Sequence, residues 1–199
     1  MKVAFVGAEE FEIRGLLARG WAARAAGPGF RAARQAGEHL IREQKPDALA
    51  SVGICGALAP DLALGEIVVD ETAAPRCDRP HRRGAVVSID RVIATAEEKQ
   101  RLAALGLVVE MESRAVAELA REHGLRFFCV KAVSDTAAED LPLDFNRYRA
   151  ADGRFEKRRI AWTAVARPLT LLPALMRLNR HSQFAARRLG EFLADCRFE

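Results

Sequence analysis

The sequence predicts a single α/β domain in which a central mixed β-sheet carries helices on both faces. Short apolar runs alternate with amphipathic stretches, and the runs are almost continuously hydrophobic, as in strands that are buried on both faces. The chain has 199 residues, half of them hydrophobic, which suits one substantial core. We divide it into an α/β core over residues 1–142 and a basic, irregular helical C-terminal extension over 143–199.

The individual elements follow from their residue patterns. Strands are expected where short apolar runs, several rich in β-branched residues, end in glycine or polar residues: 2–8, 47–54, 65–72, 85–89, 106–110 and 126–133. A helix-like stretch follows the first of these strands. Further helices are expected where the apolar residues recur at helical spacing: 31–44, 95–105 and 111–123, with Gly124 ending the last one.

The extension has a different pattern. Residues 160–178 are apolar but are interrupted by Arg167, Pro168, Pro173 and Arg177. A membrane-spanning helix needs about 20 apolar residues without such breaks, and the prolines instead predict two short helices that meet at an angle. Two interpretations stay open: the segment packs against the core, or it lies as an amphipathic segment on a membrane surface.

The charge of the chain is unevenly distributed. The net charge is +4, but residues 147–199 hold 12 Lys and Arg against 5 Asp and Glu. A basic segment of this kind favours contact with phosphate or a membrane surface, and the alternative is a solvated helical face. A nucleic-acid partner is not expected, because the chain has no recognition-helix motif and only one Tyr and two Trp.

The cysteines and the first residues indicate a cytoplasmic protein, with peripheral attachment to a membrane as a further possibility. Cys55, Cys77, Cys129 and Cys196 form no CxxC pair, so neither a disulfide framework nor a zinc site is expected. The apolar run 3–8 is shorter than a secretory signal requires. No metal or organic cofactor is implied.

Acidic residues follow several of the predicted strands. In an open α/β sheet, ligands bind at the carboxyl ends of the strands, and general acid–base chemistry uses carboxyl groups whose surroundings shift their pKa. Acids at these positions also cap helices, so the pattern alone leaves both interpretations open. The residues concerned are Glu9, Glu10, Glu12, Glu110, Glu112 and Asp135.

A glycine-rich stretch, residues 53–57, follows the second strand. Read as a loop, it would bring backbone amides towards an anion. Its spacing is not GxGxxG, so a dinucleotide site is not expected. A tight turn that simply needs glycine explains the stretch equally well.

Three motifs in this order resemble the nucleoside phosphorylase/nucleosidase superfamily. Residues 51–58 (SVGICGAL) with 64–69 (LGEIVV) are similar to its glycine stretch and GDIVV signature. Residues 109–117 (VEMESRAVA) resemble its VEMEAAAIA helix, and residues 130–137 (VKAVSDTA) resemble its VRAISDxA strand end. The resemblance covers residues 2–138 and extends to the methylthioadenosine/adenosylhomocysteine nucleosidases of the superfamily.

The extension adds a looser resemblance. Residues 135–142, 152–154, 167–168 and 172–175 are similar to the hopanoid-associated branch, whose members are implicated in removing adenine from adenosylhopane. This resemblance implies a nucleoside with a bulky 5′ substituent as the substrate. The superfamily further implies a homo-oligomer, in which a neighbouring subunit commonly completes the pocket.

The resemblance also implies roles for individual residues. Asp135, supported by Ser134, would protonate or hydrogen-bond N7 of the purine, and Glu12 would activate water. Glu112 would hold the ribose hydroxyls, with Met111 packing against the sugar. The catalytic residues are thus predicted to be Asp135 and Glu12, and the substrate-binding residues Glu112, Met111, Ser134, Gly53, Ile54, Cys55, Gly56, Val92, Ile93 and Glu110.

The chain departs from the family pattern at two of these positions. Ile54 stands where the nucleosidases often have Ser, so one ligand for water or phosphate is missing. Val92 aligns with the aromatic residue that usually stacks on the base, so stacking must be weaker or come from elsewhere. The connection between Glu71 and Ala85 is shorter than in the family, which implies a more open pocket.

The implied activity is cleavage of the N-glycosidic bond of a purine nucleoside. Hydrolysis is favoured, because the Glu12 carboxylate would repel an incoming phosphate. Phosphorolysis is the alternative, with Arg14, Arg24 or the basic extension as the phosphate clamp. A non-catalytic protein that binds a nucleoside or a membrane surface is the third possibility, favoured by Ile54 and Val92.

Overall fold

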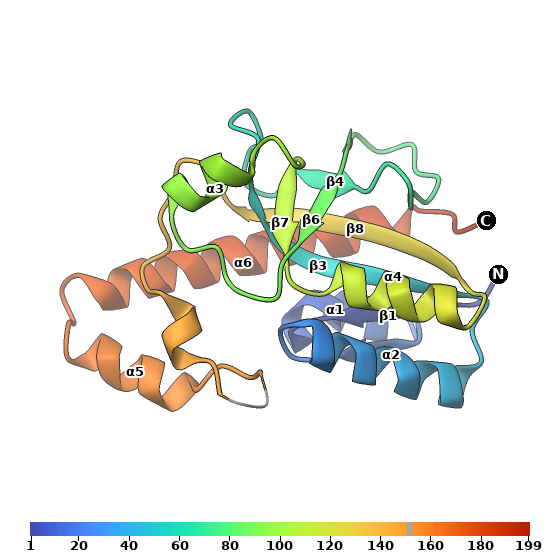
Figure 1. Cartoon of the computed structure of the whole chain (residues 1–199), viewed down its shortest axis with the longest axis horizontal. Helices are drawn as coiled ribbons and strands as arrows, with labels where there is room; N and C mark the ends of the chain where they lie inside the picture. Colours follow the sequence, from blue (N-terminus) through green and yellow to red (C-terminus); the bar gives the residue numbers. More distant parts are fainter. Residues whose placement is uncertain (151–152) are drawn as a thin grey trace.

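The computed structural model describes residues 1–150 and 153–199, and it confirms the predicted α/β domain with a mixed sheet between helices (Figure 1). All six predicted strands are present. In the described residues the sheet has eight strands: β1 (Val3–Gly7), β2 (Ala23–Ala25), β3 (Ala48–Ala57), β4 (Ile67–Val69), β5 (Arg82–Arg83), β6 (Val86–Ser88), β7 (Val108–Glu110) and β8 (Arg126–Asp135).

The helices lie close to their predicted positions. The helix-like stretch after β1 is α1, and the helices predicted at 31–44, 95–105 and 111–123 are α2, α3 and α4. The described helical elements are α1 (Glu10–Leu17), α2 (Phe30–Gln44), α3 (Ala96–Leu102), α4 (Ser113–Glu122), the 3₁₀ turn η1 (Phe145–Tyr148), α5 (Lys157–Val165) and α6 (Leu171–Ala194).

Two ten-residue strands form the centre of the sheet. β3 and β8 run parallel from the pair Ala48–Arg126 to the pair Cys55–Val133. β1 adds to β3 in parallel and β2 adds to β1 in parallel, whereas β4 is antiparallel to β8. The carboxyl ends of β1, β3 and β8 therefore point the same way, and the sheet is mixed because of β4 and β7.

One edge of β3 changes partner along its length. Its first half pairs with β1 as far as Ser51, and its end pairs with β7 from Gly56 onward. Across the other edge, Gly56 pairs with Asp135 of β8 after a register shift. Between Val52 and Cys55, no described strand covers the edge where β1 and β7 part.

The glycine-rich stretch 53–57 is therefore strand, and its prediction as a loop was wrong. Glycines here allow side chains to approach the strand closely. A Cβ on Gly53 would lie 3.0 Å from a carboxyl oxygen of Glu12, and one on Gly56 would lie 2.9 Å from Asp135 Oδ2. The glycines that suggested a turn are thus needed because two carboxyl groups lie directly against this part of the strand.

Each face of the sheet buries its own apolar cluster. On one face, Ile13 of α1 and Leu189 and Phe192 of α6 pack against β1, β3 and β8. On the other face, Leu40 of α2 and Leu119 of α4 pack against β1 and β3. Figure 1 shows α6 passing behind β3 and β8, and the two helical layers fix the sheet between them.

The extension forms two helices, as predicted, but the second one is not short. α6 has 24 residues, and Pro173 lies in its first turn, where a missing N–H costs no helical hydrogen bond. From Ser182 onward α6 lies against the sheet and contributes to the core. Asp152, part of the motif 152–154, lies outside the described residues.

Candidate active site

A cavity of about 200 Å³ is lined by residues at the carboxyl ends of β1, β3, β7 and β8. Eleven of the twelve predicted site residues line it, and Gly53 is the exception. The eleven are Glu12, Ile54, Cys55, Gly56, Val92, Ile93, Glu110, Met111, Glu112, Ser134 and Asp135.

The site concentrates buried charge. Among the residues that the structure describes, six charged side chains are buried, and each lines this cavity or forms an ion pair with a residue that does. Burying a charge is costly unless it is paired or hydrogen-bonded. The six are the carboxyl groups of Glu12, Glu110, Glu112 and Asp135 and the ammonium groups of Lys99 and Lys131.

Glu12 lies beside the segment of β3 that neither β1 nor β7 covers. Its Oε1 accepts a hydrogen bond of 3.0 Å from the amide of Ile54, on the uncovered edge of β3. Its Oε2 accepts from the amides of Ala8 and Glu9 at 2.6 and 2.8 Å. Burial raises the pKa of the Glu12 carboxyl above its ordinary value, although the amides oppose this shift. A buried carboxyl of raised pKa is suited to taking up a proton.

Glu112 also lines the cavity, immediately before α4. Its Oε1 accepts a hydrogen bond of 2.9 Å from the amide of Gly29, at the start of α2. Burial, and next the negative charge of Glu110, raise the pKa of Glu112 to about 8, against the opposing charge of Lys131. Glu112 is therefore a hydrogen-bonding group that holds a proton at neutral pH in the free protein.

Glu110 and Lys131 form a buried ion pair next to Glu112. Lys131 Nζ lies 2.7 Å from Glu110 Oε2 and donates to Ser51 Oγ at 3.0 Å. Burial favours the neutral acid, but the charge and hydrogen bond of Lys131 outweigh it and lower the pKa of Glu110. Glu110 also accepts from the amides of Glu112 and Ser113. The pair thus fixes the backbone that carries Glu112.

Asp135 lines the cavity at the end of β8. Its Oδ1 accepts from Ser134 Oγ at 2.8 Å, and its Oδ2 lies 2.6 Å from Lys99 Nζ. Lys99, from α3, is fully buried and also donates to the carbonyl groups of Thr136 and Glu139, at 2.7 and 2.8 Å. Both carboxyl oxygens are therefore held, and the carboxyl group has one fixed orientation at the cavity wall.

Lys99 and Lys131 are not among the site residues predicted from the sequence. Lys131 carried a signal, since a lysine inside the apolar run of β8 requires a buried partner. Lys99 carried none, because α3 is charged along most of its length and a lysine there is expected to face water.

The extension completes the cavity in a way that the sequence did not predict. The side chain of Asn146 exchanges two hydrogen bonds of 2.9 Å with the backbone of Val92. Arg149 bonds the carboxyl and carbonyl groups of Asp90 at 2.7 Å each. Phe155 lines the cavity itself and supplies an aromatic ring, which Val92 lacks. Asn146, Arg149 and Phe155 therefore hold one wall of the site.

A second cavity adjoins the first. It has a volume of about 920 Å³ and shares Ala8, Glu9, Pro28 and Phe155 with the smaller one. Its walls come from the start of α1, the loop after β2 and the first turn of α5. A ligand held in the small cavity therefore has space for a large substituent on this side.

The cysteines near the site are structural. Cys55 and Cys129 are buried, and burial is the main cause that raises the pKa of each thiol, for Cys129 to about 12. A thiol in this state is a poor nucleophile at neutral pH. Cys55 thus serves the cavity wall as a small apolar side chain.

The raised pKa of Glu112 predicts a pH-dependent stability. Folded Glu112 keeps its proton up to about pH 8, whereas the unfolded chain releases it near 4.5. The unfolded chain then binds fewer protons between these values, so the free energy of unfolding contributed by Glu112 falls as the pH rises from about 4.5 to about 8. We expect the urea midpoint of the wild type to fall more steeply with pH than that of Glu112→Gln. Equal slopes would contradict the shift.

Sequence comparisons identify relatives of this chain. A family model described as the phosphorylase superfamily matches residues 70–164. The 5′-methylthioadenosine/S-adenosylhomocysteine nucleosidase of Shewanella sediminis (strain HAW-EB3) is 26% identical over 156 residues, which cover 57% of this chain and 67% of that protein. The enzyme of the same name from Shewanella pealeana (strain ATCC 700345 / ANG-SQ1) is 27% identical over 150 residues, or 55% and 65% of the two chains. The matches thus span about two thirds of these relatives.

Solved structures share the whole fold. An S-adenosylhomocysteine nucleosidase from Streptococcus pyogenes, in complex with 5-methylthiotubericidin, superposes with a TM-score of 0.69 at 20% identity, covering 97% of this chain and 94% of the other. The futalosine hydrolase of Helicobacter pylori strain 26695 gives 0.70 at 14% identity, with 98% and 96% covered. The matching family model, the sequence relatives and this common fold together support the resemblance of the chain to the nucleoside phosphorylase/nucleosidase superfamily.

Proposed function

We propose that the protein hydrolyses the N-glycosidic bond of an adenine nucleoside. The observation that carries this proposal is the convergence of Glu12, Glu112 and Asp135 on one cavity. The nucleosidases among the relatives and structural neighbours support the substrate class. The resemblance of the sequence motifs supports the three roles.

In the proposed reaction, each carboxyl group acts on a different part of the substrate. Glu12 takes a proton from water, and the water oxygen bonds to C1′ of the sugar. The bond from C1′ to N9 breaks, its electron pair moves into the purine, and Asp135, in its protonated form, supplies a proton at N7. Afterwards Glu12 releases its proton to solvent and Asp135 takes one up, which restores both groups. Glu112 hydrogen-bonds the 2′ and 3′ hydroxyl groups and holds the sugar between the other two. Neutralising the base makes it a better leaving group.

Water is favoured over phosphate by the backbone of the site. The amides of Ala8, Glu9 and Ile54 are those that an anion would use, and all three donate to the Glu12 carboxyl. The one arginine in the lining of the small cavity, Arg91, lies 2.6 Å from Glu98. Of the candidate clamps, Arg14 lines the larger cavity instead. A bound phosphate would therefore lie next to the Glu12 carboxyl group, at a place where it needs free hydrogen-bond donors.

A bulky 5′ substituent is the proposed distinguishing feature of the substrate. The cavity of about 920 Å³ begins where the smaller one ends, at Ala8 and Phe155. Phe11, Ala25 and Ala26 give this larger cavity apolar surface. These features, with the motifs of the extension, favour a nucleoside such as adenosylhopane, whose 5′ substituent is a large hydrocarbon.

Adenine release in phosphate-free buffer tests the reaction. We expect the purified protein to release adenine from a 5′-substituted adenosine, with a free sugar as the second product and no rate increase when phosphate is added. Strict dependence on phosphate, with a sugar 1-phosphate as product, would establish phosphorolysis instead. Tight binding of the nucleoside without any release would identify the non-catalytic alternative, which Ile54 and Val92 favour.

A further inference from the structure

Large apolar side chains are exposed at the end of the molecule formed by α5 and the first turns of α6. Trp162 is 74% exposed and Leu169, in the connection between the helices, is 90% exposed. Apolar groups of this size are rarely left together in water unless they bind something. We define the α5–α6 apolar patch as Trp162, Val165, Leu169, Leu172 and Met176, all of them exposed.

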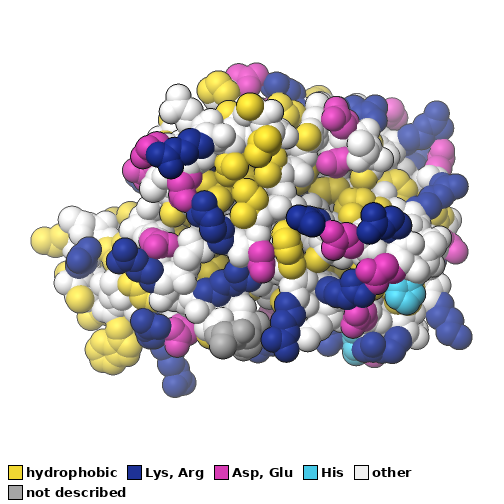
Figure 2. Space-filling view, viewed as in Figure 1, with side chains coloured by type: hydrophobic (Ala, Val, Ile, Leu, Met, Phe, Trp, Pro, Cys, Tyr) yellow, Lys and Arg dark blue, Asp and Glu magenta, His cyan; other side chains and the backbone are white. Residues whose placement is uncertain are grey.

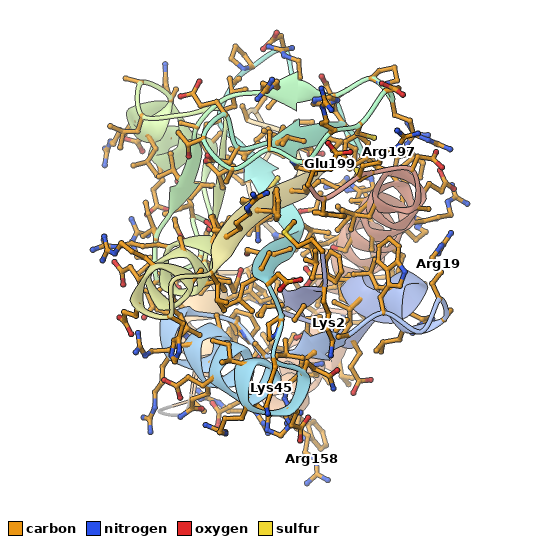
Figure 3. All side chains as sticks on the ribbon, turned by 90° about the vertical axis from the view of Figure 1, so that its right-hand side faces the viewer. Lys2, Arg19, Lys45, Arg158, Arg197 and Glu199 are labelled. Carbon is orange, nitrogen blue, oxygen red and sulfur yellow. The ribbon has the colours of Figure 1, made fainter. Side chains whose placement is uncertain are left out.

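Arginine side chains accompany the α5–α6 apolar patch. Arg158 lies one turn before Trp162 on α5, and Arg180 lies one turn after Met176 on α6, so each continues the apolar stripe of its helix. Figure 2 shows yellow apolar and blue cationic side chains together at the left end of the molecule, where Figure 1 places α5. Figure 3 shows Arg158 projecting away from the body of the protein.

The segment of sequence that carries the α5–α6 apolar patch is strongly basic. Residues 153–190 contain nine Lys and Arg and one acidic residue, Glu156. Outside this region and residues 151–152, the chain has 22 Lys and Arg and 25 Asp and Glu. An apolar surface flanked by arginines matches an anionic bilayer, whose headgroups attract the arginines while its interior receives the apolar side chains.

We propose that the α5–α6 apolar patch docks the protein on the surface of an anionic lipid bilayer. Trp162 and Leu169 enter the interfacial region, where an indole ring is favoured, and the arginines contact the phosphates. A second copy of the chain is a poorer partner, because a symmetric contact would bring two strongly basic segments together. In the described part of the chain, no helix combines the length and apolar character that crossing a bilayer requires.

The position of the α5–α6 apolar patch relates it to the larger cavity. The first turn of α5, including Arg158 and Arg159, forms part of that cavity's wall. Docking through α5 therefore brings the larger cavity close to the lipid surface. A substrate with an apolar 5′ substituent would then have a short path from the bilayer to the site.

Vesicle binding by the full chain tests the proposal without reference to activity. We expect the protein to co-sediment with vesicles of phosphatidylcholine and phosphatidylglycerol but not with vesicles of phosphatidylcholine alone, and we expect added salt to weaken binding. In a Trp21→Phe background, the emission of Trp162 should shift to shorter wavelength only with the anionic vesicles. Arg158→Gln and Arg180→Gln should each weaken binding about fivefold, and Leu169→Ser with Met176→Ser about tenfold or more.

Matched controls lie elsewhere on the surface. Leu105→Ser removes an exposed leucine near α3, and Arg42→Gln with Arg121→Gln removes two charges from α2 and α4, so these variants should bind vesicles as the wild type does. Equal binding to neutral and anionic vesicles, or no binding to either, would overturn the proposal. A dimer in light scattering that Leu169→Ser dissociates, together with absent vesicle binding, would assign the patch to a contact between copies. None of these outcomes depends on the proposed hydrolysis.

Discussion

Asp135→Asn is expected to lower the rate of adenine release by about 10²–10⁴-fold, the usual contribution of a general acid. Asparagine keeps the size of the side chain and can still accept a hydrogen bond, but it has no proton to give to N7. Lys99 loses its ion-pair partner in this variant and keeps the carbonyl groups of Thr136 and Glu139. The fold should therefore survive with reduced stability.

The measurement is kcat for adenine release, compared with the fraction of folded protein from circular dichroism. Asp78→Asn is the matched control, because Asp78 is exposed and lies outside both cavities. It makes the same chemical change without touching the proposed mechanism. An Asp135→Asn variant that is folded and as active as the control would remove the acid from the mechanism.

Glu12→Gln should reduce hydrolysis by a similar factor, about 10²–10⁴-fold. A glutamine cannot accept the proton of water. In the wild type, one carboxyl oxygen of Glu12 accepts from the amide of Ile54 and the other from the amides of Ala8 and Glu9. The NH₂ group of the glutamine would therefore face an N–H donor in either orientation. We expect a lower melting temperature in addition to the lower rate.

A measurement of nucleoside binding distinguishes the loss of the base from simple unfolding. Nucleoside binding, measured by calorimetry with an analogue that cannot be cleaved, should persist in the folded Glu12→Gln variant, because Glu112 and Asp135 still hold the ligand. Glu71→Gln, at an exposed position outside both cavities, controls for the substitution itself. Hydrolysis that continues at the control rate would exclude Glu12 as the base.

The central strands and the acidic site could be predicted because each has a local signal. The runs of β3 and β8 are apolar on both sides, so they are stable only in the middle of a sheet that is covered on both faces. Carboxyl groups that follow parallel strands necessarily meet at one edge. These two rules bring Glu12 and Asp135 to the same cavity without any knowledge of side-chain contacts. Glu112 follows the antiparallel strand β7 and reaches the cavity because β7 pairs with the end of β3.

The missed features depend on contacts between distant residues. β2 and β5 have only three and two residues, and pairing with β1 and β4 defines them rather than their own propensity. Lys99 is buried only because Asp135 and two carbonyl groups meet it there. Pro173 predicted a break near its position, but a proline in the first turn leaves the rest of α6 intact.

The residues that line the small cavity lie as far apart in the sequence as Ala8 and Phe155, so the cavity forms late during synthesis on the ribosome. The partners β1 and β3 are both present once residue 57 has emerged, but Asp135 reaches Gly56 only after β8 has been translated. The two hydrogen bonds between Asn146 and the backbone of Val92 form later still. A nascent chain therefore lacks the complete small cavity until the residues as far as Phe155 have emerged.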